Sequence, residues 1–187
     1  VLRQLGFDVT GIDLSDLKIA ECLEHEDPYL NFYKHDMRRT FRINYFDCVF
    51  NFFTSFAYFD SIRDDAKAAH IMASNLKPNG VLVIDYLNAN HALLNLQNRE
   101  ELNTEDYQFR IRRSKKNGMI NKEIECKDGS LRLMFYEQVR LYSLKDMVNL
   151  FERFGLILEE QFGSYELDPY DELQSDRMIL IFHKKTK

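Results

Sequence analysis

The sequence predicts an α/β fold built on a doubly wound, mostly parallel sheet with an antiparallel closing hairpin. In the first half of the 187-residue chain, apolar strand-like segments alternate with helical segments, which is typical of a parallel sheet. The second half contains two strong hairpin turns, Asn117-Gly118 and Asp128-Gly129. These turns predict an antiparallel strand trio inserted after the fourth parallel strand.

The parallel half of the sheet contains four predicted strands and two full helices. Gly6 ends the last turn of a helix over residues 1–6, and Ser15 caps the next helix, which closes before Pro28. A later helix stops at the turn signal "KPNG", residues 77–80. The predicted strands are residues 7–13, 30–36, 45–53 and 81–88, and the predicted helices are residues 16–26 and 63–76.

The second half contains the inserted trio and the closing elements. Its third strand carries five apolar side chains on one face at a period of two, which are Leu131, Leu133, Phe135, Val139 and Leu141. An amphipathic helix then runs from its cap, Ser143, to Gly155. The trio spans residues 107–116, 119–127 and 131–143, and the closing strands are residues 156–167 and 177–185. We predict one domain, residues 1–187, with an insertion at about 105–142.

Composition narrows the class of protein. A hydrophobic content of 45% is enough for one sizeable core, and the net charge of -5 gives no general attraction to nucleic acid or an anionic membrane. The three cysteines, Cys22, Cys48 and Cys126, lack a C-x-x-C spacing, so we expect reduced thiols in a cytoplasmic protein. No apolar run is long enough to span a bilayer, and the scattered histidines predict no metal site.

Polar side chains end each of the four predicted parallel strands. Asp13, Asp36, Asn51 and Asp85 occupy these positions. Ligands of such sheets bind beyond the carboxyl ends of the strands. A single acid there is as often a helix cap or a solvated turn, but two on successive strands favour a ligand site. Asp85 equally suits a structural role.

The order of these segments resembles that of the class I S-adenosylmethionine-dependent methyltransferases. The resemblance rests on "GFDVTGIDLS", "FYKHDMR", "YFDCVFNFFTSFAYF" and "LKPNGVLVIDYLN", followed by a helix and a closing hairpin. It covers nearly the whole chain apart from the inserted trio, which in that family is a variable element on the substrate side. It implies S-adenosyl-L-methionine as the cofactor and a small molecule as the methyl acceptor.

The resemblance also implies roles for particular residues. Asp13 would hold the two ribose hydroxyls, with Leu14 beside it, and Asp36 would accept from the adenine amino group. The backbone N–H of Met37 would face the adenine ring, and Asn51 and Phe52 would line the methionine portion. Candidate substrate residues are Phe56, Tyr58, Tyr86 and Asn88, with the trio and the 168–176 loop as the substrate wall. No catalytic residue is assigned.

One expected element is missing from these residues. A glycine-rich cofactor loop should lie about 20 residues before the ribose acid, and counting back from Asp13 runs past Val1. In the resembled family, the first strand lies between the strands that end at Asp13 and Asn51. Without it, two apolar strand edges stay open and invite pairing with other chains, including a homodimer. We therefore expect this chain alone to bind S-adenosylmethionine poorly or not at all.

Two other functions stay open on the sequence. A nicotinamide-dependent oxidoreductase would use Asp13 for its ribose equally well, although the closing hairpin and Asp36 argue against it. A degenerate, non-enzymatic domain would associate with partners through its open sheet. The missing glycine-rich loop is the feature that favours this last alternative.

Overall fold

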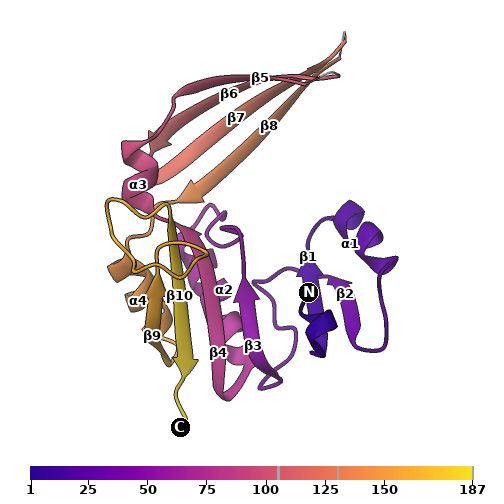
Figure 1. Cartoon of the computed structure of the whole chain (residues 1–187), viewed down its shortest axis with the longest axis vertical. Coiled ribbons are helices and arrows are strands. Elements are labelled where there is room, and N and C mark those ends of the chain that lie inside the picture. The colour runs from indigo at the N-terminus through magenta and orange to yellow at the C-terminus, as the bar shows by residue number, and fades with distance from the viewer. Residues whose placement is uncertain (105, 130, 187) are drawn as a thin grey trace.

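The computed structural model describes residues 1–104, 106–129 and 131–186, which form three regions (Figure 1). The central region, here called the sheet core, is a four-stranded sheet in the order β3-β4-β10-β9. Its strands are β3 (Phe46–Asn51), β4 (Leu76–Leu87), β10 (Arg177–Lys184) and β9 (Leu156–Phe162). β3 and β4 are parallel, whereas β10 is antiparallel to both of its neighbours, so the predicted closing hairpin is confirmed.

Two helices cover one face of the sheet core. α2 (Ile62–Asn75) and α4 (Leu144–Glu152) pack against each other and against the sheet, and both lie behind it in Figure 1. Phe151 of α4 is fully buried, and its ring centroid lies 5.6 Å from that of Phe56 and 5.1 Å from that of Phe182. Ser143 and Asp146 form the capping box that starts α4, as the sequence predicts for Ser143.

The second region, here called the N-terminal lobe, comprises residues 1–36. It contains η1 (Arg3–Leu5), β1 (Val9–Asp13), α1 (Asp16–Leu23) and β2 (Leu30–Lys34). β1 and β2 form a parallel pair of their own, and no described strand joins β1 to β3. Gly6 adopts a φ of 91° and ends η1, a conformation that glycine takes without steric strain.

The third region, here called the arm, is an antiparallel sheet of four strands and not the predicted three. They are β5 (Arg99–Asn103), β6 (Gln108–Lys116), β7 (Met119–Asp128) and β8 (Leu131–Arg140). The prediction missed β5 because its charged sequence lacks β propensity. Antiparallel backbone pairing with β6 places it in the sheet, and Glu100 lies 2.6 Å from Arg113 and Glu101 3.2 Å from Arg110.

Other boundaries differ from the predicted ones for local reasons. The expected turn at residues 77–80 is an irregularity within β4, where Asn79 has a φ of 63° and the register to β3 shifts. α1 ends at Leu23, earlier than predicted, and a short helix, α3 (Ala89–Leu94), follows β4. Among the described residues, no helix is long and apolar enough to cross a membrane.

Candidate functional site

The two predicted acids lie at the same edge of the N-terminal lobe. β1 and β2 are parallel, and the N–H of His35 donates to the carbonyl of Asp13 across 2.9 Å. Asp13 is exposed, and its Oδ1 accepts from the backbone N–H of Ser15 at 2.8 Å. This bond fixes the carboxylate at the start of α1, next to the exposed Leu14.

Asp36 is held by its neighbour Arg38. The Nε and Nη2 atoms of Arg38 donate to the Asp36 carboxylate at 3.0 and 2.7 Å, and the Arg38 backbone N–H adds a bond of 2.9 Å. The Arg38 side-chain bond is the main reason that the pKa of Asp36 falls to about 2. Asp36 is therefore an ionised hydrogen-bond acceptor whose two oxygens already accept from Arg38. Met37, between them, packs against the core.

Asn51 and Phe52 lie at the carboxyl end of β3. Asn51 is 7% exposed, and among the described residues its Oδ1 has no hydrogen-bond partner. Buried polar atoms are nearly always paired, so this oxygen is available to a donor from a ligand. Phe52 is exposed and stacks on Phe50 with a centroid separation of 5.2 Å.

The loop that follows β3 is strained and firmly held. Phe53, Thr54 and Ala57 have φ values of 56°, 58° and 66°, in the left-handed region that side chains normally avoid. The Asp85 carboxylate accepts from the Phe53 N–H at 2.7 Å, and the Asp85 carbonyl accepts from the Thr54 N–H at 3.0 Å. Backbone strain of this kind persists where the surroundings enforce it, and it is common at functional sites.

Asp85 therefore has a positioning role, which the sequence left open. Arg177, the first residue of β10, donates its Nε to Asp85 Oδ1 at 2.7 Å and its Nη2 to Thr54 Oγ1 at 3.1 Å. Tyr165 adds a hydroxyl bond of 3.0 Å to the same carboxylate. The sequence analysis missed Arg177 and Tyr165. They lie far from Asp85 in the chain, and only the β4–β10 pairing brings Arg177 close.

The four candidate substrate residues are placed differently from one another. Phe56 and Tyr86 are fully buried, and the Tyr86 hydroxyl donates to the carbonyl of Arg140. Asn88 is 1% exposed, and its Nδ2 donates to the carbonyls of Glu172 and Ser175 at 2.9 and 2.7 Å. These three side chains have essentially no exposed surface with which to touch a substrate, because packing and internal bonds occupy them. Tyr58 remains 43% exposed, and partial burial raises its pKa.

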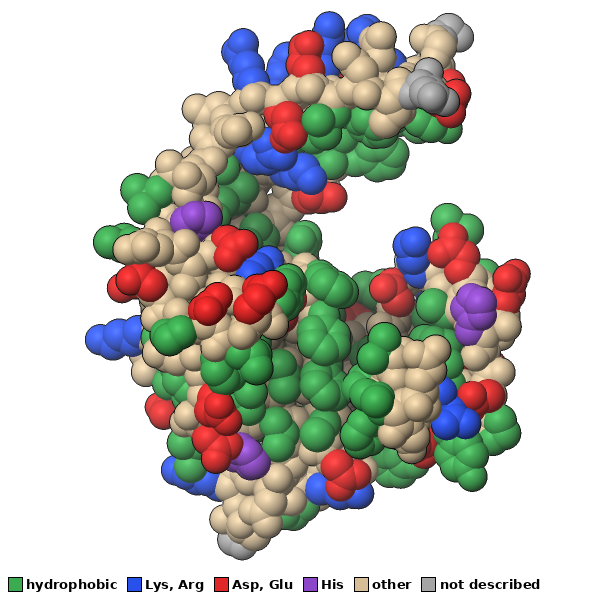
Figure 2. All heavy atoms as spheres, in the orientation of Figure 1, with side chains coloured by type: hydrophobic (Ala, Val, Ile, Leu, Met, Phe, Trp, Pro, Cys, Tyr) green, Lys and Arg blue, Asp and Glu red, His purple; other side chains and the backbone are tan. Residues whose placement is uncertain are grey.

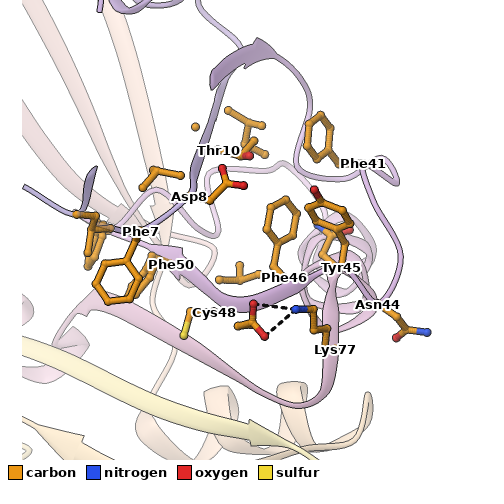
Figure 3. A pocket seen from close by; sticks show the side chains of 18 residues that line it. Phe7, Asp8, Thr10, Phe41, Asn44, Tyr45, Phe46, Cys48, Phe50 and Lys77 are labelled. Carbon is orange, nitrogen blue, oxygen red and sulfur yellow. Dashed lines mark hydrogen bonds and ion pairs between the residues drawn. The ribbon is translucent and has the colours of Figure 1, made fainter. Parts of the chain in front are cut away.

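A groove separates the N-terminal lobe from the sheet core (Figure 3). Its volume is about 830 Å³, and residues of both β1 and β3 line it. In the close-up, Phe7 and Phe50 lie at one end, and Phe41, Tyr45 and Phe46 at the other. Across the described residues, no three His, Cys, Asp or Glu side chains come together in a way that could hold a metal ion.

Together, the α/β sheet, the antiparallel β10 beside β4 and the polar strand ends define a domain of the class I methyltransferase type. A family model described as a methyltransferase domain matches residues 1–161. The chain therefore belongs to this methyltransferase domain family, and the resemblance and fold class predicted from the sequence are confirmed. A search of curated proteins gave no match.

Solved methyltransferase structures share the fold at low sequence identity. The CcbJ methyltransferase from Streptomyces caelestis has 15% identity and a TM-score of 0.83, covering 99% of this chain and 78% of that one. An S-adenosylmethionine-dependent methyltransferase from Clostridium acetobutylicum has 15% identity and a TM-score of 0.80, covering 95% and 75%. SAM-bound CalS10, an amino pentose methyltransferase from Micromonospora echinaspora, has 16% identity and a TM-score of 0.69, covering 95% and 74%.

Proposed function

We propose that this protein transfers the methyl group of S-adenosylmethionine to a small-molecule acceptor. The observation that carries the proposal is the position of Asp13 and Asp36 at the ends of two adjacent parallel strands. One face of an adenosine can meet both carboxylates only if they lie at the same sheet edge, as these do. Membership of the methyltransferase domain family and the SAM-bound state of CalS10 support the same cofactor.

The residues at this edge fit the cofactor in most respects. The exposed Asp13 carboxylate is suited to two ribose hydroxyls, with Leu14 beside the sugar, because an ionised acceptor makes the stronger hydrogen bonds. The unpartnered Oδ1 of Asn51 is suited to the ammonium group of the methionine portion, next to Phe52. The bound cofactor supplies an electrophilic methyl group on a sulfonium sulfur.

The adenine end requires a local change. Asp36 and the backbone N–H of Met37 would face the adenine, yet Arg38 now occupies both oxygens of the Asp36 carboxylate. The Arg38 guanidinium also lies over the Phe59 ring, 4.8 Å from its centroid. Since Arg38 is partly exposed, it can turn to solvent and free one carboxylate oxygen for the adenine amino group.

What this chain's residues contribute to methyl transfer is alignment and exclusion of water. Holding two reactants in line can supply about 7–11 kcal/mol of a barrier without any acid or base. The strained 53–57 loop, pinned by Asp85 and Arg177, is rigid enough to present Phe53 to the reacting groups. Exposed aromatic faces such as Phe53 attract a sulfonium by about 1–2 kcal/mol when water is displaced.

The arm suggests an acceptor with an apolar body. Cross-strand pairing places Phe135 beside Ile124, and Leu133 beside Cys126. With Leu131 they share one face of the arm, and Figure 2 shows an apolar surface on the side that overhangs the open concavity. Leu131, Leu133 and Phe135 are 54%, 42% and 50% exposed, so this face is free to cover an acceptor. The 168–176 loop, fastened by Asn88, would form the opposing wall.

Saturation-transfer difference NMR on the full chain tests the proposal, because it detects weak ligands. We expect S-adenosylhomocysteine to give signals from its adenine and ribose protons and NAD to give none. Because no described strand lies beside β1 on its groove side, we expect a dissociation constant above about 1 mM. A lower dissociation constant would contradict the expected weak binding but would still support the proposed function.

A matched pair of variants assigns the signal to the strand edge. Asp13→Ala should abolish the S-adenosylhomocysteine signal, since it removes the ribose acceptor. Asp16→Ala, in the first turn of α1 with a side chain 81% exposed, should leave the signal unchanged. Equal binding by Asp13→Ala and the unaltered chain, or stronger signals from NAD, would overturn the proposed function.

A further inference from the structure

The apolar face of the arm is interrupted by a charged pair near the root of the arm. The face that carries Leu131, Leu133 and Phe135 is here called the inner face, and Figure 2 shows its apolar surface above the open concavity. Glu137 lies on the same face, because alternate residues of a strand point to the same side. Lys122 lies directly opposite Glu137 on β7. A charged pair within an apolar face is informative, because it points to a polar partner.

Glu137 keeps one carboxylate oxygen available to a ligand. Lys122 Nζ donates to Glu137 Oε2 at 3.1 Å, whereas Oε1 accepts no hydrogen bond from the described part of the chain. The Glu137 side chain is 47% exposed, so a ligand can reach it. Val139, the next residue of β8 on this face, is buried. Glu137 therefore lies where the exposed inner face ends and the sheet core begins.

The strained loop after β3 brings Tyr58 to the root of the arm. The backbone N–H of Arg140 donates to the carbonyl of Ala57 at 3.0 Å, so β8 and the segment that contains Tyr58 are directly bonded. Tyr58 is 43% exposed and follows the loop that presents Phe53 to the proposed reacting groups. The proposed methyl-transfer site and the inner face of the arm therefore meet at this residue.

The hydroxyl of Tyr58 lies within the electrostatic influence of Glu137. Burial is the main cause that raises the pKa of Tyr58, the negative charge of Glu137 raises it further, and Arg177 lowers it. Charges shift the pKa of a hydroxyl in this way when they lie nearby. Together with the shared backbone bond, this places Tyr58 and Glu137 at one polar position beside the apolar inner face.

The charges around this position favour a cation. Lys122 is paired with Glu137, and Arg177 donates its Nε to Asp85 at 2.7 Å, so both positive charges are already matched by carboxylates. The loop that leads into β10 lies below the arm in Figure 1 and contains no lysine or arginine. Its acidic residues are Glu166, Asp168, Asp171, Glu172 and Asp176. A site lined by charges of one sign concentrates ligands of the opposite sign.

We propose that Glu137 and Tyr58 hold the protonated amino group of the methyl acceptor, so that the acceptor is an amine with an apolar body. This inference rests on the proposed function. The ammonium donates to Glu137 Oε1 and to the Tyr58 hydroxyl, and the body lies against Phe135. Two residues of a strand span about 7 Å, which sets the distance from the amino group to the centre of the body. Glu137 binds and orients the acceptor and takes no part in proton transfer.

Binding of small aromatic probes to the full chain tests the proposal without any cofactor. Phenethylamine carries an ammonium and an apolar ring, phenethyl alcohol has nearly the same shape without the charge, and hydrocinnamate carries a negative charge. By saturation-transfer difference NMR, we expect the dissociation constant of the amine to be about tenfold lower than that of the alcohol, because its hydrogen bond to Glu137 is charge-assisted. Hydrocinnamate should bind most weakly. Equal binding of amine and alcohol, or strongest binding of hydrocinnamate, would overturn the proposal.

A matched pair of variants removes one negative charge from either face of the arm. Glu137→Gln should raise the dissociation constant of phenethylamine about tenfold and leave that of phenethyl alcohol unchanged, because only the charge is lost. Glu123 is exposed and pairs with Tyr136 on the opposite face, so Glu123→Gln should change neither value. A damaged fold would weaken the alcohol as well, which makes the alcohol an internal control. Equal effects of the two substitutions on the amine would refute the assignment to Glu137.

Intermolecular nuclear Overhauser effects then locate the bound amine. Leu133 and Met134 are consecutive residues of β8 with similar exposure, 42% and 46%, but they point to opposite faces of the arm. We expect effects from the phenyl ring to the methyl groups of Leu133, and from the methylene group beside the nitrogen to the ring of Tyr58. Effects to the Met134 methyl group instead would place the amine on the outer face and contradict the proposal.

The outcome is separable from that of the proposed function, since the amine is measured without S-adenosylhomocysteine. A chain that binds phenethylamine through Glu137 but gives no S-adenosylhomocysteine signal would refute only the proposed function. A chain that binds S-adenosylhomocysteine through Asp13 but does not prefer the amine over the alcohol would refute only the amine subsite.

Discussion

The sheet core and the N-terminal lobe are both made of parallel strands and helices, but they are stabilised differently. The sheet core buries Phe151, Phe182, Leu82 and Met147 at 0% exposure. Among the described residues of the lobe, only Ile19 is buried, with 9% of its surface exposed. The lobe is instead held by polar contacts at its surface, such as Arg3 to Asp27 at 2.8 Å and Lys34 to Asp16 at 2.6 Å. Exposed ion pairs of this kind contribute little to stability.

This difference shows that the lobe buries much less apolar surface than the sheet core. Burial of apolar surface is the dominant favourable term in folding, and the side of the lobe that would bury it faces the groove. The lobe also carries Asp13 and Asp36, so the proposed cofactor edge lies in a region with less buried apolar surface than the sheet core. Low local stability is common in elements that order when a ligand or partner binds.

The largest expected effect comes from deleting a side chain in the sheet core. Phe151→Ala should lower the free energy of unfolding by about 3–5 kcal/mol, because it leaves a cavity among Phe56, Phe182 and their neighbours. Ile19→Ala in the lobe should reduce global stability by less than about 2 kcal/mol, since the lobe can open without unfolding the sheet core. Urea denaturation measures both. Equal losses would show that lobe and core unfold as one cooperative unit.

The second prediction concerns the attachment of the arm to the sheet core. This attachment uses a buried polar cluster, whereas the polar contacts of the lobe are exposed. Asp65 of α2 is 0% exposed and accepts from Arg140 Nε at 2.6 Å and from the Tyr142 hydroxyl at 2.8 Å. Asp65→Ala should destabilise the protein by about 3–5 kcal/mol, since it leaves the Arg140 charge buried without a partner. The double variant Asp65→Leu/Arg140→Leu should recover much of this loss.

Thermal denaturation of Asp65→Leu, of Arg140→Leu and of the double variant measures the coupling. If Asp65→Ala is no more destabilising than Asp27→Ala, which breaks the exposed pair with Arg3, then the arm is not held by this cluster. The two substitutions thus compare a buried ion pair, Asp65 with Arg140, with an exposed one, Asp27 with Arg3, in the same protein. It also tests whether the arm keeps its position over the proposed acceptor site.

The sequence predicted those parts of the molecule that local pattern determines. Alternation of strands and helices, the Ser143 cap and the Asn117-Gly118 turn all correspond to observed elements. β5 was missed because its backbone pairing with β6, and not its own propensity, places it in the sheet. Such pairs join residues that are distant in the chain, so no local pattern reports them.

The candidate site was predictable only in part for the same reason. The ends of strands can be read from a sequence, so the positions of Asp13, Asp36 and Asn51 at or just after strand ends were predicted. Burial cannot be read in this way, because an aromatic residue after a strand suits the core and a substrate pocket equally. Phe56 thus proved to be fully buried, whereas Phe53, three residues earlier, is 76% exposed. The role of Arg177 required the three-dimensional pairing of β10 with β4.

The smallest expected effect concerns Asp36 at the end of the lobe. Arg38 lowers the pKa of this carboxyl from 3.8 to about 2, so the ionised form is the one that the folded protein stabilises. The stabilisation is therefore fully present above pH ~4 and is lost as the pH falls toward about 2. Because water screens the partly exposed Arg38, we expect only about 1 kcal/mol from this pair.

Titration of the Asp36 carboxyl carbon by NMR measures this directly, with Arg38→Gln as the control. The unaltered chain should titrate near pH 2, and Arg38→Gln should raise the pKa of Asp36 toward 3.8 because the main stabilising bond is gone. A midpoint near 3.8 in the unaltered chain would mean that Arg38 does not hold the carboxylate in solution. Asp36 would then be free to accept an adenine amino group without any rearrangement, and weak cofactor binding would have to arise from the groove alone.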